Sequence, residues 1–159
     1  MTSTMHLVLL ILHMLAAAVW LGGSVALVFV AIPAVRTVEG AARLAALRTL
    51  GRRWRPLGWG SMAVLVASGL GLAAGEGAFD TRMLFETAGG RLLLAKSILV
   101  LVLIVFSALH DFVLGPRLAR EIGEGRPERS RRPLVRVGWT GFFLSVLVPI
   151  LGIVLAELL

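Results

Sequence analysis

Four long apolar runs, separated by loops in which arginine is concentrated, constrain this fold most strongly. Each run can cross the hydrocarbon core of a bilayer, which takes about 20 residues. Only 16% of the 159 residues are charged, whereas a soluble domain carries about 25%. The sequence predicts one all-α domain, an integral membrane four-helix bundle. Its expected spans are at about residues 7–34, 57–74, 92–114 and 137–158.

The distribution of arginine predicts the orientation of the chain. Positively charged loops stay on the cytoplasmic side of a membrane. We therefore expect the first and third loops in the cytoplasm, and both termini on the outer, periplasmic side. The arginines of these two loops are Arg36, Arg43, Arg48, Arg52, Arg53, Arg55, Arg117, Arg120, Arg126, Arg129, Arg131, Arg132 and Arg136. They account for the net charge of +7, so the expected partner is the lipid bilayer and no nucleic acid.

Three local patterns predict how the inner boundary is built. Residues 38–53 alternate apolar and arginine positions at helical spacing, which predicts a short helix lying on the inner membrane face. Pro33 and Pro116, near the inner ends of spans one and three, predict helix ends. Trp54, Trp59 and Trp139 lie where an aromatic belt would meet the headgroups.

The first span carries a polar stripe that marks the candidate site. At 3.6 residues per turn, His6, His13, Trp20 and Ser24 share one face. Such a stripe faces protein, water or a bound group rather than lipid. Counting along the helices puts His13 about 9 Å and Lys96 about 6 Å below the outer boundary. Spans one and three run in the same direction, so we expect these two side chains to face each other.

A second polar cluster is predicted at the cytoplasmic end of span three. His110 comes fourteen residues after Lys96, about 21 Å further along the helix. Asp111 lies beside it and Arg117 beyond it, as in a polar cap at a helix end. Because His13 and His110 differ in depth by about 18 Å, they should not share a metal ion or a haem iron.

Residue types narrow the chemistry. The chain has no cysteine and no tyrosine, which excludes disulfides and thiolate metal sites. Met1, Met5 and Met14 lie near the outer end, and their soft sulfurs suit Cu(I), with His6 and His13 as nitrogen donors. Ordinary apolar packing of the methionines, and a neutral imidazole hydrogen-bonded inside the bundle, are the alternatives. No hydrolase or kinase motif is present.

Small residues recur every four positions in span two, at Ala63, Ala67, Gly71 and Gly75. This spacing lets a neighbouring helix approach closely. It favours packing inside the bundle and leaves the seam of a homo-oligomer as the alternative.

The chain resembles the copper resistance protein D family, inner-membrane proteins linked to copper uptake from the periplasm. The residues that carry the resemblance are His13, Trp20-Leu21-Gly22-Gly23, Pro33, Ser68-Gly69-Leu70, Lys96 and Leu114-Gly115-Pro116. The resemblance implies copper binding and import at the periplasmic side of a bacterial inner membrane, with a periplasmic copper-binding protein as a partner. With the histidine stripe, it suggests His13 as the main metal ligand and His6 and Met5 as capture groups. Lys96, Trp20 and Ser24 would line or gate the site.

Two alternatives remain at this point. The chain is similar in outline to the HemJ-type protoporphyrinogen oxidases, four-helix proteins that bind haem b. That resemblance implies an oxidoreductase with His13 as axial ligand and Lys96 near a propionate or a substrate carboxylate. The chain departs from that family at Val28 and Phe29, where the family has a proline-arginine pair. The other alternative is a membrane assembly subunit without a ligand of its own.

Overall fold

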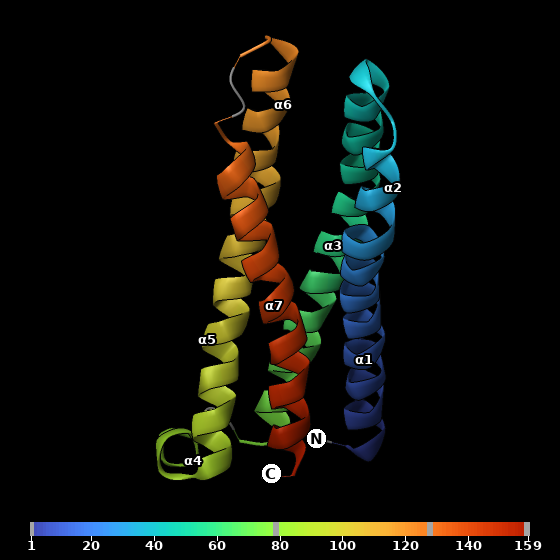
Figure 1. Ribbon diagram of the computed structural model, residues 1–159. Coiled ribbons are helices and arrows are strands. Elements are labelled where there is room, and N and C mark those ends of the chain that lie inside the picture. Colours follow the sequence, from blue (N-terminus) through green and yellow to red (C-terminus); the bar gives the residue numbers. More distant parts are fainter. Residues whose placement is uncertain (1, 78–79, 127–128, 158–159) are drawn as a thin grey trace.

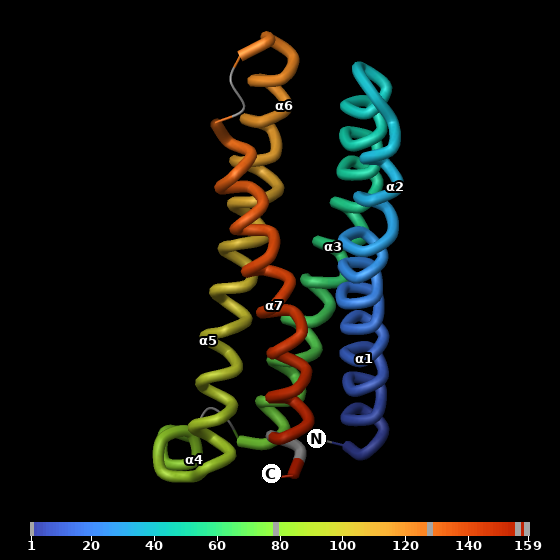
Figure 2. The backbone as a smooth tube through the Cα atoms, in the orientation of Figure 1, coloured from blue at the N-terminus to red at the C-terminus, as the bar shows by residue number. Residues whose placement is uncertain are grey.

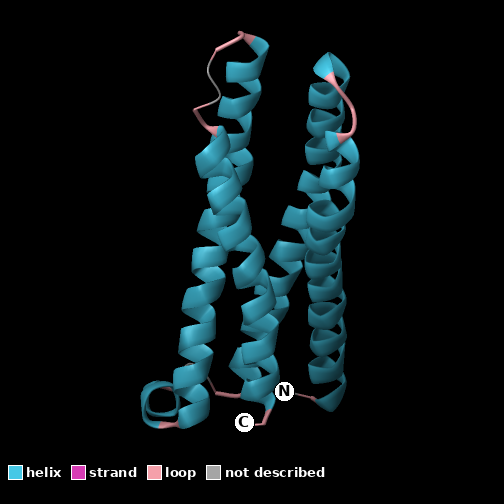
Figure 3. Ribbon diagram, viewed as in Figure 1, coloured by secondary structure: helices cyan, strands magenta, loops and turns pink. Residues whose placement is uncertain are grey.

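The computed structural model describes residues 2–77, 80–126 and 129–157, with the backbone alone at 155 and 156. Every regular element in this described part is helical (Figure 3). Four helical runs are long and apolar enough to cross a membrane, which confirms the predicted all-α, four-span fold. They are Ser3–Arg36, Gly40–Gly75, Ala88–Gly123 and Arg131–Val154.

The first and third runs are built in the same way. Each begins with a long α-helix that a threonine caps: the side chain of Thr2 accepts the N–H of Met5, and that of Thr87 accepts the N–H of Gly90. Each continues through a π turn into a short α-helix. The elements are α1 (Ser3–Ala26), η1 (Leu27–Ala31) and α2 (Ile32–Arg36), then α5 (Ala88–Ala108), η2 (Leu109–Leu114) and α6 (Gly115–Gly123).

The two prolines do not end their helices, so that prediction was wrong. Pro33 and Pro116 occupy the first turn of α2 and α6, directly after the two π turns. A proline has no N–H, and its ring clashes with the carbonyl four residues earlier in an α-helix. The wider hydrogen-bond pattern of a π turn removes that conflict, so the chain stays helical through both prolines.

The predicted surface helix at residues 38–53 is also wrong. These residues enter α3 (Gly40–Gly75), a single helix of 36 residues that is about 54 Å long. Alanine, leucine and arginine, which dominate its first turns, are strong helix formers. In addition, Arg48 Nη2 donates to the carbonyl of Ala119 on α6 at 2.9 Å, which ties the first part of α3 to the third span rather than to the membrane face.

Consecutive spans form two antiparallel hairpins. Helix α1 packs along α3, and α5 packs along α7 (Arg131–Ala156), as the tube in Figure 2 shows. The short helix α4 (Thr81–Glu86) packs on α5. The two hairpins diverge toward the end that carries α2 and α6 (Figure 1).

Both basic loops lie at one end of the molecule, and both chain termini lie at the other with α4 (Figure 1). We call these the basic end and the terminal end. The positive-inside rule predicts that the basic end faces the cytoplasm. The apolar runs 57–74 and 92–114 are inner parts of longer helices. Helix α7 starts before residue 137, and Leu158 lies outside the described residues.

In the described part, polar side chains of the spans are buried, whereas many large apolar side chains of the spans are exposed. Ser68 and Ser145 are only 3% and 5% exposed. By contrast, large apolar side chains such as Leu15, Phe143 and Ile153 are exposed. This is the distribution expected when lipid tails cover the outside and polar groups must find partners within the protein.

Candidate functional site

His13 is held against the second span by a hydrogen bond. Its Nδ1 lies 3.0 Å from Ser68 Oγ. The Ser68 hydroxyl donates its single proton to the carbonyl of Val64, at 2.6 Å. The same hydroxyl lies 3.3 Å from the carbonyl of Leu65, so Ser68 joins the imidazole to the backbone of α3. A neutral imidazole keeps a lone pair on one of its two ring nitrogens, and that nitrogen can bind a metal ion.

Glycines provide the space for the polar side chains at this level. A Cβ at Gly69 would lie 3.2 Å from His13 Cε1, so the half-buried imidazole packs directly on α3. A Cβ at Gly152 would lie 3.0 Å from Lys96 Nζ, so the lysine from α5 ends against α7. We call His13, Ser68, Gly69, Lys96 and Gly152 the His13 site.

Lys96 comes from the other hairpin, on α5, and His13 lies on α1. Within the described part of the chain, no carboxylate forms an ion pair with Lys96. A half-buried ammonium without a counter-ion opposes any further cation nearby.

The expected capture groups lie on the first turn of α1. Met5 is 52% exposed and His6 is partly exposed, so both are accessible from the terminal end. His6 is seven residues from His13, about 10 Å along the helix axis. The two histidines therefore form successive positions rather than one ligand set. Met14 is also exposed, and Met1 lies outside the described residues.

Trp20 and Ser24 face inward from α1 on the basic side of His13. Trp20 Nε1 donates to Ser145 Oγ on α7 at 3.0 Å, which joins the two hairpins. Its ring lies against that of Trp54, with centroids 6.3 Å apart. Ser24 donates to the backbone carbonyl of Trp20 at 2.7 Å. These contacts close the bundle between the His13 site and the basic end.

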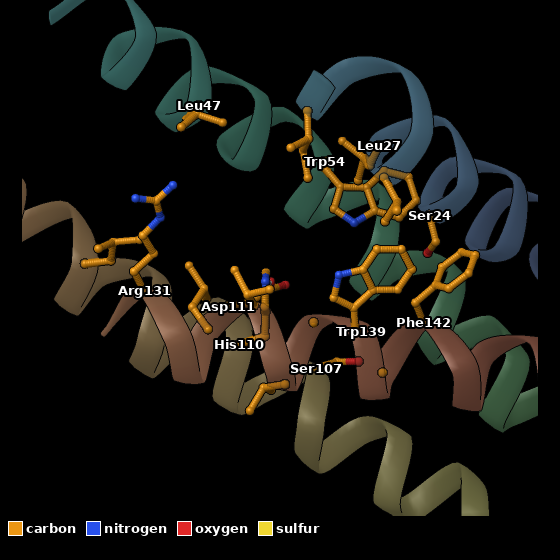
Figure 4. A pocket seen from close by; sticks show the side chains of 18 of the residues that line it. Ser24, Leu27, Leu47, Trp54, Ser107, His110, Asp111, Arg131, Trp139 and Phe142 are labelled. Atoms are coloured by element: carbon orange, nitrogen blue, oxygen red, sulfur yellow. The ribbon is translucent and has the colours of Figure 1, made fainter. Parts of the chain in front are cut away.

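A cavity of about 620 Å³ opens beyond this closure, between the hairpins (Figure 4). We call it the basic-end cavity. Arginines from the first and third loops, aromatic rings and the His110–Asp111 pair line it. The lining residues used below are Trp20, Arg36, Arg43, Trp54, His110, Asp111, Arg131, Trp139, Gly141 and Phe142.

His110 and Asp111, inside the π turn η2, form a hydrogen-bonded pair. His110 Nδ1 lies 2.9 Å from Asp111 Oδ1, and Trp59 Nε1 donates to Asp111 Oδ2 at 3.0 Å. Arg55 Nη2 donates to the backbone carbonyl of Asp111 at 2.6 Å. A Cβ at Gly138 would lie 3.3 Å from His110 Nε2, so the ring packs on α7. His110 and Asp111 therefore lie in one polar cluster, to which three elements contribute.

The partners in this cluster differ from those that the sequence suggested. Arg117 is exposed and is not among the described residues of the cavity wall, whereas Arg55 contacts Asp111. Trp54 and Trp59 do not form an outward belt. Trp54 packs inward against Gly23, where a Cβ would overlap its ring, and Trp59 binds Asp111. Each tryptophan finds a glycine surface or a hydrogen-bond acceptor inside the bundle, which outweighs placement at the interface.

Sequence reasoning missed the glycines that hold these side chains. Gly23, Gly69, Gly138 and Gly152 each face a large or polar side chain from another helix. Two signals were available: Gly23 and Gly69 lie in the motifs that carry the family resemblance, and 18 of the 159 residues are glycine. Which glycine meets which side chain depends on helix pairing, and spacing within one helix does not reveal it.

The fold and the polar interior define a four-span helical membrane protein with histidines at two depths. Residues 48–155 match the family of copper resistance protein D, and this match covers more than half of the chain. The chain therefore belongs to the copper resistance protein D family and is a copper resistance membrane protein. No curated protein and no solved structure matches it significantly.

Some of the candidate residues lie within the family match and others lie before it. The match includes Ser68, Lys96, His110 and Asp111, and it begins after α1, which supplies His13. In the described residues, no group of three or more histidine, cysteine, aspartate and glutamate side chains could hold a metal ion. A metal ion at His13 would therefore need methionine, backbone or solvent ligands as well.

Proposed function

We propose that this protein takes up copper ions at its terminal end, on the periplasmic side of a bacterial inner membrane, and passes them inward. Copper is the cargo in this proposal, and His13 is its main ligand within the bundle. The observation that carries the proposal is the fixed imidazole of His13. Ser68 holds it against α3, in a chain of the copper resistance protein D family.

Capture would begin at the exposed first turn of α1. The Met5 thioether and the His6 imidazole are ligands that suit Cu(I), and both are accessible to solvent or to a periplasmic copper-binding partner. His13 follows about 10 Å further along the same helix. The copper ion would move from one position to the next, because His6 and His13 are too far apart to form a single ligand set.

Lys96 would make copper binding at His13 transient. Its ammonium group has no carboxylate partner in the described part of the chain. Repulsion between this charge and a copper ion lowers affinity, which favours release over storage. Trp20 and Ser24 would then act as the gate, since the Trp20–Ser145 hydrogen bond closes the bundle on the basic side.

The direct test is Cu(I) affinity of the purified protein, measured by competition with bicinchoninate. We expect His13→Ala to abolish high-affinity binding. Ser68→Ala should weaken binding by about 10- to 100-fold, as loss of a group that orients a metal-bound histidine does. His110→Ala is the matched control, because it removes another partly buried histidine outside the His13 site. Unchanged affinity in His13→Ala would overturn the proposal.

An absorption spectrum separates copper from haem. We expect protein purified from haem-replete cells to show no Soret band, either oxidised or reduced with dithionite. A Soret band that His13→Ala removes would replace the copper proposal with the haem alternative. Co-purification with a stoichiometric partner and no Cu(I) binding would instead support an assembly role.

A further inference from the structure

The basic-end cavity is not explained by copper capture at the opposite end of the bundle. Its volume of about 620 Å³ lies within the range of about 300–1,000 Å³ that is typical of small-molecule sites. The cavity is also distinct in chemistry, because no methionine is among its described lining residues. It therefore suits a ligand other than a soft metal ion.

The cavity has a basic side and an apolar side. Arg36 and Arg43 line it where α2 meets α3, and Figure 4 shows Arg131 pointing into it from α7. At the other side lie the rings of Trp54, Trp139 and Phe142 (Figure 4). The Trp139 and Phe142 rings pack edge to face, with centroids 5.9 Å apart, and offer an apolar wall. A ligand that contacts both sides must itself be amphiphilic.

The charged residues that line the basic-end cavity favour an anionic ligand. Asp111 is the one carboxylate among the described lining residues, and its oxygens already bind His110 Nδ1 and Trp59 Nε1. No carboxylate of the described chain forms an ion pair with Arg36 or Arg43. Guanidinium groups bind phosphate through paired hydrogen bonds, so these two arginines are available to an anionic headgroup.

We propose that the basic-end cavity binds an anionic phospholipid, with its phosphate at Arg36 and Arg43 and an acyl chain against Trp139 and Phe142. The lipid would come from the membrane leaflet at the basic end. Anionic lipids are concentrated in the cytoplasmic leaflet, and basic pockets between membrane spans bind their headgroups. This binding does not depend on copper. The bound lipid fills the space between the hairpins on the inner side of the Trp20–Ser145 closure.

The test is native mass spectrometry of the full chain in detergent, with added phosphatidylglycerol or phosphatidylcholine. We expect one phosphatidylglycerol per chain, retained at concentrations about tenfold below those that phosphatidylcholine requires. The pair Arg36→Gln and Arg43→Gln should remove this preference. The control pair, Arg52→Gln and Arg53→Gln, changes exposed arginines outside the cavity wall and should keep it.

A second variant tests the apolar side. A Cβ at Gly141, which lines the cavity, meets no atom within 4 Å, so Gly141→Leu should fill the space without a clash and block lipid retention. Gly22→Leu is its control, because Gly22 is equally open but lies outside the cavity wall. Equal lipid retention in Gly141→Leu and the unmodified chain overturns the proposal. So does displacement of the lipid by millimolar inorganic phosphate, which would assign the site to a free anion.

Discussion

The two halves of the molecule place histidines in opposite surroundings. At the terminal end, His13 and Lys96 are packed on glycines, and the residues of this site come from four helices. At the basic end, His110 borders a cavity of about 620 Å³ that contains arginines and aromatic rings. Trp20 and Ser145 separate the two. The packed site fits our proposal of one small ion at a time, and the wide basic cavity fits our proposal of a larger anionic ligand.

The largest effect should come from breaking the close packing of α1 on α3. In Gly23→Leu the new side chain must displace the Trp54 ring, and such overpacking costs about 3 kcal/mol. Thermal unfolding in detergent, followed by tryptophan fluorescence, measures the loss. Gly22→Leu should unfold near the temperature of the unmodified chain, because a Cβ there meets nothing. An equal fall in unfolding temperature in the two variants would show that contact with the Trp54 ring is not the reason why residue 23 must be a glycine.

The next effect concerns the basic end. Asp111→Asn removes the negative charge that binds His110 and Trp59, and hydrogen bonds to charged groups contribute about 1.5–3 kcal/mol. We expect a clear fall in unfolding temperature with Cu(I) affinity unchanged. Glu124→Gln, at an exposed ion pair with Arg126, should have almost no effect on stability. A loss of copper affinity in Asp111→Asn would mean that the two ends are coupled.

Removing the charge of Lys96 sharpens the comparison at the terminal end. In Lys96→Leu the repulsion between the ammonium and a copper ion is lost and no new copper ligand is added, so Cu(I) affinity should rise about tenfold. Bicinchoninate competition measures this change, and Arg91→Leu, which removes an exposed cation on the same helix, is the control. A fall in Cu(I) affinity would instead show that Lys96 stabilises the structure of the copper site.

The smallest effect should be at the boundary between the two halves. Trp20→Phe and Ser145→Ala each remove the hydrogen bond that joins α1 to α7. Interhelical hydrogen bonds in membranes contribute about 1 kcal/mol, so a double-variant cycle should give a coupling energy of that size. A coupling energy of zero would show that the aromatic contact with Trp54, rather than the hydrogen bond, closes the bundle.

Much of the His13 site could be anticipated by counting residues along the chain. The helical period puts His6, His13 and Trp20 on one face of the first span. Counting residues from the outer boundary places Lys96 at a depth similar to that of His13. The partner of His13 could not be found in this way, because Ser68 lies 55 positions away. The same holds for Gly152, which lies on a helix that the sequence does not pair with Lys96.

The errors also have physical causes. Residues 38–53 have an amphipathic pattern, and such a pattern fits a helix on a membrane surface as well as one that leans on a neighbour. The hydrogen bond from Arg48 to Ala119 decides between them. Pro33 and Pro116 were expected to end helices because proline removes a hydrogen bond. Only the folded chain shows that a π turn precedes each one.

The sequence by itself determined the number of spans, the placement of both basic loops at one end and the separation of His13 from His110. These properties follow from hydrophobic length, the charge of the loops and the fixed rise of a helix. The tertiary structure alone decided which serine holds His13, which glycine receives each side chain and where the bundle is hollow. Those properties depend on contacts between helices that are distant in the chain, and the spacing of residues along one helix does not predict such contacts.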